Sequence, residues 1–120
     1  MQSTAPSIVV AQPETWQTQA GRFAGEWQGG ASGANICVIV NLVEKAGEGV
    51  RLHRHPYAET FVVRKGKASL MIGDERIEGH AGQIIVVPAG VPHGFTNVGP
   101  GPLEMIDIHE NGTFITEWLA

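Results

Sequence analysis

The chain has 120 residues, of which 42% are hydrophobic and 17% charged, and its net charge is -4. This length suits one domain, and the composition is that of a chain that buries a core rather than that of a disordered chain. The acidic balance excludes the basic surface that nucleic-acid binding requires, and no apolar run approaches the ~20 residues that span a bilayer.

The N-terminal residues and the single cysteine indicate a reduced, cytoplasmic setting. Met1–Ala11 lacks the basic region of a signal peptide, and its apolar stretch Ile8–Ala11 is too short for one. Cys37 is the only cysteine, so no intrachain disulfide can form. We expect Cys37 to be a small core residue, because it lies in the apolar run Ile36–Val40.

Sixteen glycines and seven prolines divide the chain into short segments, which favours an all-β meander over a helical bundle. Between these turns, β-branched and aromatic residues form runs of strand length. The expected strands are Phe23–Trp27, Ile36–Val43, Val50–His55, Glu59–Arg64, Ala68–Ile72, Arg76–Glu78, Ile84–Val87, Pro92–Asn97 and Leu103–His109. Phe114–Leu119 fits either a strand or a short helix.

The spacing of turn signals, roughly every 8–12 residues, is typical of a sandwich or a barrel. The sequence contains no internal repeat, low-complexity tract or linker. We therefore expect residues 1–120 to form a single domain, with a barrel core at about 36–109, N-terminal strands within 1–35 and a C-terminal tail at 110–120.

Three histidines and one glutamate are spaced as metal ligands would be. His53 and His55 are two residues apart, so they point to one face of a strand, whereas on a helix they would lie roughly 200° apart. Glu59 begins the next expected strand, and His93 shares its face of a later strand with Asn97. In a barrel, inward-facing residues of neighbouring strands converge at one level.

This ligand set suits a divalent transition metal, namely Fe, Mn, Ni, Co, Cu or Zn, and suits Ca or Mg poorly. Four protein ligands on a six-coordinate ion leave two positions open, as a catalytic site requires. A diol, an enediol or a 2-oxo acid would fit these positions. The alternative is that the histidines are satisfied by backbone carbonyls and bind nothing.

The turn residues around this constellation carry a resemblance. The first motif is Gly47, five residues, His53-x-His55, three residues, Glu59, six residues and Gly66. The second motif is Gly82, five residues, Pro88-x-Gly90, two residues, His93, three residues and Asn97. With both motifs complete and 15 residues between them, the chain resembles the small single-domain bacterial members of the cupin superfamily.

The resemblance implies a small antiparallel β-barrel, or jelly roll, of two packed sheets, with one divalent metal per subunit on His53, His55, Glu59 and His93. It also implies a metal-dependent enzyme acting on a small organic substrate, either a dioxygenase-like oxidoreductase or an isomerase or cyclase. The alternatives are a non-catalytic module that binds or senses a small molecule, and a structural dimer that the ion stabilises. A homodimer formed by exchange of N-terminal strands is a further expectation.

Two residues are candidates for acid–base chemistry. Tyr57 lies between two of the candidate ligands, as a proton donor at the pocket mouth or as a cap of the barrel. His109 shares a strand face with Asp107 and would enter the pocket if that face pointed inward. Ile106 and Ile108 form the opposite, apolar face, so we favour the surface for His109.

Four further residues are candidates for the pocket wall. Phe61, Phe95 and Met105 are expected in the barrel core, where a small barrel also uses them to contact substrate. Asn97 shares a face with His93 and would either contact the pocket or stabilise a turn through its amide. We favour the turn role.

Overall fold

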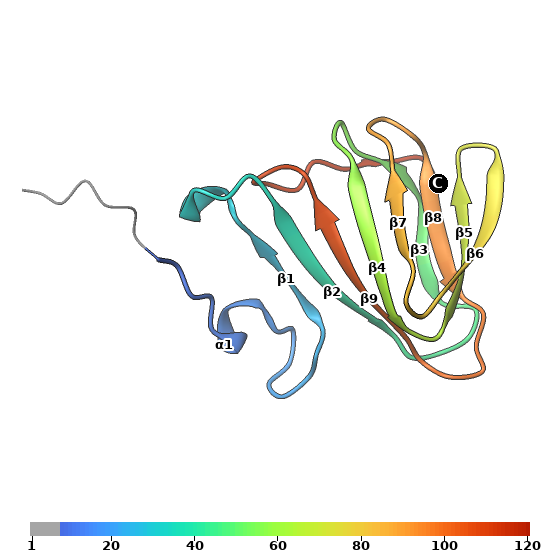
Figure 1. Ribbon diagram of the computed structural model, residues 1–120, viewed down its shortest axis with the longest axis horizontal. Helices are drawn as coiled ribbons and strands as arrows, with labels where there is room; N and C mark the ends of the chain where they lie inside the picture. Colours follow the sequence, from blue (N-terminus) through green and yellow to red (C-terminus); the bar gives the residue numbers. More distant parts are fainter. Residues whose placement is uncertain (1–7) are drawn as a thin grey trace, which may run out of the picture.

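The computed structural model describes residues 8–120, which form two five-stranded antiparallel sheets packed together (Figure 1). The first sheet has the order β1-β2-β9-β4-β7, with strands β1 (Gly25–Gln28), β2 (Cys37–Val43), β9 (Leu103–His109), β4 (Glu59–Lys65) and β7 (Ile84–Val87). The second sheet has the order β10-β3-β8-β5-β6, with strands β10 (Glu117–Trp118), β3 (Gly49–Arg54), β8 (His93–Asn97), β5 (Lys67–Ile72) and β6 (Glu75–His80).

The jelly-roll expectation is confirmed, and each expected strand appears with its ends shifted by at most a few residues. No ladder of hydrogen bonds joins the two sheets among residues 8–120, so they pack as a jelly roll without closing into a barrel. The undecided C-terminal segment forms the short strand β10.

The N-terminal region holds the short strand expected near Phe23–Trp27. Residues 1–7 lie outside the described part of the chain, and the rest of 1–35 holds one strand of the two sheets, β1, together with a short helix and a 3-10 turn. The helix α1 (Pro13–Trp16) begins at a proline, which is favoured in the first turn because its missing N–H is not needed there. The 3-10 turn is η1 (Gly30–Ser32). In Figure 1, α1 lies beside β1, at the edge of the first sheet.

The interior between the sheets has an apolar end and a polar end. On β4, Glu59, Phe61 and Val63 point inward, as their alternation predicts. The register places Val63 opposite Met105 but Glu59 opposite His109. The apolar core consists of Phe61, Val63, Ala68, Leu70, Val87, Phe95, Leu103 and Met105. On β4 and β9, buried polar side chains therefore share one end, and buried hydrophobic side chains share the other.

His109 is buried, with 3% of its surface exposed, so the surface placement that we favoured is wrong. The inward face of β9 carries Leu103, Met105, Asp107 and His109. Ile106 and Ile108 lie on the opposite face of the sheet and are only partly buried. The inward face was hard to recognise because its last two residues are polar.

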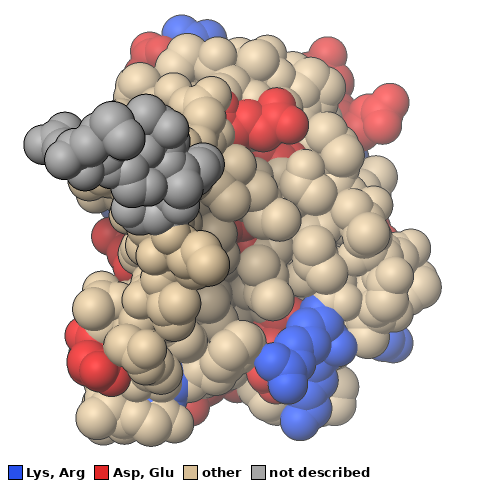
Figure 2. Space-filling model, turned by 60° about the vertical axis from the view of Figure 1, so that its left-hand side comes forward, with Lys and Arg blue, Asp and Glu red and all other residues tan. Residues whose placement is uncertain are grey.

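One face of the molecule, shown in Figure 2, carries acidic side chains spread among uncharged ones, while basic side chains gather in small patches. This agrees with the acidic net charge of the sequence. Among residues 8–120, no helix is both long and apolar enough to cross a bilayer.

Two motif glycines offer a matched test of the turns. Gly66 and Gly82 both have positive φ, at 87° and 94°, where an L side chain costs about 1–2 kcal/mol. A Cβ on Gly66 would lie 2.4 Å from the carbonyl oxygen of Pro102, whereas one on Gly82 would meet nothing within 4 Å. We therefore expect Gly66→Ala to lower the urea midpoint more than Gly82→Ala does. Equal midpoints would contradict the close approach at Gly66.

Candidate metal centre

The structure brings the four predicted ligands together at the polar end of the interior. His53 on β3 lies directly opposite His93 on β8, while His55 follows β3 and Glu59 begins β4. All four are buried, with at most 6% of their surface exposed, and one candidate ligand atom from each lies within 4.8 Å of the others. The β3–β8 register shifts between Val50 and His53, an irregularity of the kind that re-aims side chains.

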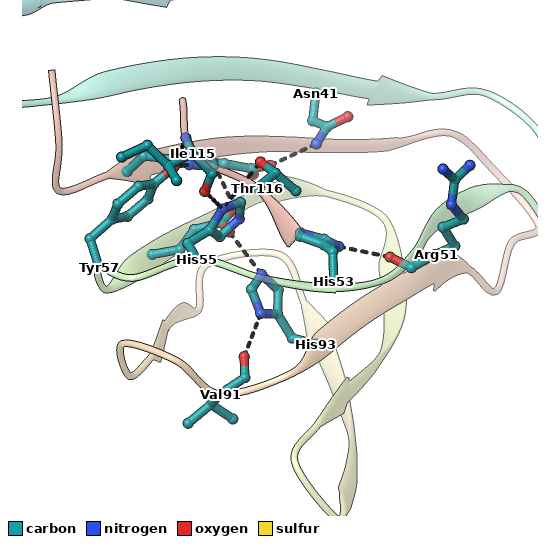
Figure 3. Close-up of polar contacts among 12 residues, drawn as sticks. Asn41, Arg51, His53, His55, Tyr57, Val91, His93, Ile115 and Thr116 are labelled. Carbon is teal, nitrogen blue, oxygen red and sulfur yellow. Dashed lines mark hydrogen bonds and ion pairs between the residues drawn. The ribbon is translucent and has the colours of Figure 1, made fainter. Parts of the chain in front are cut away.

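Backbone carbonyls fix the orientation of all three imidazoles (Figure 3). The Nδ1 atoms of His53, His55 and His93 lie 2.7, 2.8 and 2.9 Å from the carbonyl oxygens of Arg51, Ile115 and Val91, in that order. A carbonyl oxygen only accepts, so each Nδ1 carries the proton and donates it. In a neutral ring this leaves the Nε2 lone pair free, which is the usual arrangement around a protein-bound metal.

The Nε2 atoms of two of these rings approach the same carboxylate oxygen. Glu59 Oε1 lies 2.9 Å from His93 Nε2 and 3.1 Å from His55 Nε2, but only the His93 contact has hydrogen-bond geometry. Lone pairs of neutral imidazoles facing a carboxylate repel unless a proton or a cation lies between them. The donor set is a borderline nitrogen and oxygen set, so these residues fit a divalent transition metal.

The electrostatics of the cluster show how strongly its members interact. Burial alone would raise the pKa of Glu59, but hydrogen bonds and charges from the surrounding imidazoles outweigh it and hold this pKa well below its usual range. Burial would lower the pKa of His55, but the Glu59 contact and the hydrogen bond to the Ile115 carbonyl together outweigh burial and raise it. The pKa of His53 is lowered, chiefly by burial. Glu59 is therefore the anion around which the cluster is organised.

His109 and Tyr57 form a second buried pair beside Glu59. Tyr57 Oη accepts a hydrogen bond from the Ile115 N–H at 3.3 Å, which leaves its own proton for His109 Nδ1 at 2.7 Å. Burial raises the pKa of Tyr57, so its hydroxyl remains a donor. A neutral His109 then carries its proton on Nε2, which lies 3.2 Å from Glu59 Oε2.

Asp107 and Asn41 are site residues that the sequence interpretation did not select. Asn41 Nδ2 donates to Asp107 Oδ2 at 2.6 Å, while Asp107 Oδ1 has no hydrogen-bond partner among residues 8–120. Asp107 is 1% exposed, and its pKa is raised by burial and then by the charge of Glu59. A buried polar atom without a partner costs about 1–3 kcal/mol. The sequence feature that could have indicated Asp107 is its position on the same strand face as His109.

A cavity of about 330 Å³ opens beside the cluster, between the two sheets. Its wall consists of Glu26, Ile39, Asn41, Val50, His53, Glu59, Phe95, Asp107, His109, Phe114, Thr116 and Trp118. The last three residues come from the C-terminal tail, which β10 holds against β3 through the pairing of Trp118 with His53. The tail therefore forms part of the site.

The four predicted pocket residues divide between wall and core. Phe95 lines the cavity and also belongs to the apolar core. Phe61 and Met105 lie in the core but do not line this cavity. Asn97 stabilises a turn, as we favoured: its Nδ2 donates to the carbonyls of Val43 and Gly101, and its Oδ1 accepts from the Gly99 N–H.

The fold and the cluster define a double-sheet jelly-roll protein with a candidate metal centre between its sheets. The family model described as "Cupin domain" matches residues 41–109, more than half of the sequence. The chain therefore belongs to the cupin family. It is also 29% identical over 80 residues to mannose-1-phosphate guanylyltransferase 2 of Escherichia coli O157:H7, a match that covers 66% of this chain but only 16% of that protein.

Solved structures share the fold. A structure of Bacillus subtilis oxalate decarboxylase, studied for its Mn(II) centres, matches with a TM-score of 0.73 and 22% identity over 80% of this chain and 27% of that chain. An uncharacterized conserved protein from Klebsiella pneumoniae subsp. pneumoniae MGH 78578, with a double-stranded β-helix domain, matches with a TM-score of 0.71 and 20% identity, covering 95% of this chain and 98% of that one. At these identities the likeness is one of fold.

The histidine pair offers a direct test of metal binding. We expect His53→Ala combined with His55→Ala to abolish metal retention, because two of the four candidate ligand atoms are lost. The measurement is the metal-to-protein ratio of the untagged protein by elemental analysis. His80→Ala is the matched control, because His80 is exposed and lies outside the cluster. An unchanged ratio in the folded double variant would remove the assignment.

Glu59 is the only anionic member of the ligand set. We expect Glu59→Gln to weaken metal affinity by about tenfold or more, because the amide keeps the shape but loses the charge. Competition with a chromogenic chelator measures the change. Glu48→Gln, at an exposed position, is the control and should retain the native affinity. Equal affinities for native protein and Glu59→Gln would mean that Glu59 is not coordinated.

Proposed function

We propose that this chain is a metal-dependent enzyme acting on a small organic substrate, with one divalent transition ion held by His53, His55, Glu59 and His93. The observation that carries the proposal is the convergence of the four ligand atoms within 4.8 Å beside a cavity of about 330 Å³. A site for a small molecule next to open coordination positions is the arrangement that metal catalysis needs.

When bound, such an ion supplies Lewis acidity and a template for the substrate, and Fe, Mn, Ni or Cu would also support oxygen chemistry. The chain contributes the orientation of the ligands through the three Nδ1 hydrogen bonds. The apolar side chains of the cavity wall, such as Phe95 and Phe114, limit the access of water. Manganese is the first metal to test, because the structural relative from B. subtilis has Mn(II) centres.

We propose His109 as the acid–base residue and Tyr57 as the residue that positions it. His109 lines the cavity beside Glu59, and the Tyr57 hydroxyl holds its Nδ1. This hydrogen bond fixes the tautomer that keeps a proton on Nε2, near the place where a substrate would lie. Both residues are buried, with 8% of the surface of Tyr57 and 3% of that of His109 exposed.

The second candidate function is a non-catalytic module that binds or senses a small molecule through the same metal. The cavity supports both candidates equally, whereas it argues against an ion that only stabilises the fold, since a purely structural site is closed. The His109–Tyr57 pair favours the enzyme, because simple capture of a ligand does not need a buried proton donor with a fixed tautomer.

Oxygen uptake by the metal-loaded protein would separate these functions. The assay covers diols, catechols and 2-oxo acids, with product analysis for isomerisation and cyclisation. We expect turnover of at least one class, and we expect His109→Gln to lose about 100-fold or more in rate while it keeps its metal. Tyr57→Phe should lose less, because it frees the tautomer without removing the imidazole. Binding without conversion of any compound would identify the non-catalytic module.

We further propose that the protein is a homodimer built on the outer face of the first sheet. The register aligns an apolar row across its strands, Val40–Ile106–Val62–Ile84, and a neighbouring row that is apolar except for one threonine, Val38–Ile108–Thr60–Val86. Ile84 and Val86 are 68% and 58% exposed at the end of these rows. A largely apolar sheet face of this kind is typical of a protein–protein interface.

The N-terminal arm supports exchange between the two copies. Ile8, Val9 and Val10 are apolar and at least half exposed. They precede α1, which lies beside β1 at the edge of the same sheet (Figure 1). If the apolar arm of one copy packed against the apolar sheet face of a second copy, both surfaces would be removed from water.

A charge placed in the apolar rows tests the dimer. We expect Val86→Glu to convert the dimer to a monomer, because the carboxylate would be buried without a partner in the interface. Light scattering after size exclusion gives the mass. Val98→Glu is the control, because Val98 is 45% exposed but lies outside the sheets. A native protein that is monomeric at every concentration would contradict the proposal.

We also propose a reduced, cytoplasmic setting and a single domain over the whole chain. Cys37 is a free thiol and is buried, so it is not available for a disulfide at the surface. Both sheets share one apolar core, which supports a single folding unit.

A further inference from the structure

The cavity has a second polar group besides the candidate metal ligands. It is formed by Asn41 on β2 and Asp107 on β9, joined by the hydrogen bond between Asn41 Nδ2 and Asp107 Oδ2. Both residues line the cavity, and the bond between them does not use Asp107 Oδ1. Asp107 Oδ1 is fully buried and has no partner among residues 8–120.

Two other buried polar atoms in the described part of the chain also lack a hydrogen bond, His55 Nε2 and His109 Nε2. Both of these nitrogens lie within 3.2 Å of the Glu59 carboxylate, so each already faces an opposite charge. No such contact exists for Asp107 Oδ1 among residues 8–120. A buried polar atom with no partner on the cavity wall indicates a group supplied from the cavity.

The Asn41–Asp107 pair lies one step along the strands from the metal cluster. Asp107 and His109 are two residues apart on β9, and the register places His109 opposite Glu59. Two residues of strand span about 6.8 Å. A molecule of a few carbon atoms would therefore reach from the candidate metal to Asp107.

The charges of the wall restrict what that molecule is. Three of the described wall residues carry a carboxyl group: Glu26, Glu59 and Asp107. No described wall residue is Lys or Arg. A dianionic substrate would meet carboxyl groups at the end away from the metal. A hydroxyl group both donates and accepts, so it satisfies Asp107 Oδ1 whether or not that carboxyl carries a proton.

We propose that Asn41 and Asp107 bind a hydroxyl group of a neutral, hydroxylated small molecule, a polyol or hydroxyketone of three to five carbons. This deepens the proposed function and rests on it, because the other end of the molecule would bind at the metal. The apolar wall residues Val50 and Phe95 would cover its carbon chain.

Saturation-transfer NMR on metal-free protein and on Zn-loaded protein tests this inference. The probes are dihydroxyacetone, glycerol and erythrulose, each compared with a carboxylate of similar size, namely glycerate or oxalate. We expect the neutral probes to bind more tightly than the acids. We also expect Asp107→Leu to weaken their binding by about tenfold, because one buried hydrogen-bonding group is lost, while zinc stoichiometry stays native.

Asp74→Leu is the matched control, since Asp74 lies in the turn between β5 and β6, outside the cavity, and should leave binding unchanged. If Asp107→Leu does not fold, Asn41→Leu gives the same test from the other member of the pair. Three results would each overturn the inference. They are neutral-probe affinity in the folded variant equal to that of the native protein, tighter binding of the acids than of the neutral probes, and no binding of the neutral probes.

The metal arm keeps this inference separate from the proposed function. A protein that takes up neither zinc nor manganese overturns the proposed function, and the metal-free samples then decide the inference alone. If the metal-free protein binds the neutral probes and this binding depends on Asp107, the inference is supported. If the metal-free protein shows no such binding, the inference is overturned. Zinc uptake combined with probe binding that ignores Asp107 would overturn only the inference.

Discussion

The structure depends on one buried carboxylate. Glu59 is 3% exposed, between two sheets that otherwise enclose a hydrophobic core. An ionised carboxylate in such surroundings is strongly destabilising unless positive charge or hydrogen-bond donors surround it. Imidazoles from the segment after β3, from β8 and from β9 lie within 3.2 Å of this carboxylate, so one residue draws together strands that are far apart in the sequence.

The backbone takes part in this arrangement as much as the side chains do. Three carbonyls hold the Nδ1 atoms of the histidines, and one of them, at Ile115, comes from the C-terminal tail. The Ile115 N–H also holds the Tyr57 hydroxyl, which in turn holds His109. A tail that pairs with β3 over only two residues thereby orients a candidate metal ligand and a candidate acid–base residue.

The division of the interior explains how a chain of this size holds both a stable core and a polar site. The inward faces of β4 and β9 carry hydrophobic residues at one end and polar residues at the other, as Val63 and Glu59 do on β4. The apolar end stabilises the fold by burial, and this stabilisation holds the polar end in place. Asp107 lies at the boundary between the two ends, where burial raises its pKa and where it lines the cavity.

Local patterns in the sequence predicted the strands and the ligand set. His53 and His55 lie on one face because side chains alternate along a strand, and the motif glycines turn the chain at positive φ, as at Gly66 and Gly82. His109 was misplaced because either face of β9 could be the core face from its sequence. Ile106 and Ile108 on the outer face are apolar, while the inward face begins with apolar residues but ends in two polar ones. Alternation tells which residues share a face, but not which face is covered.

The sequence by itself determined the strands, the turns and the four residues that converge, because these follow from periodicity and from local backbone preferences. Only the tertiary structure decided which face of β9 points inward, that Tyr57 pairs with His109, that Asn41 pairs with Asp107, and that the tail lines the cavity. Each of these facts depends on contacts between residues more than fifty positions apart, or on which sheet covers which face. Long-range packing decides them, and no local pattern encodes it.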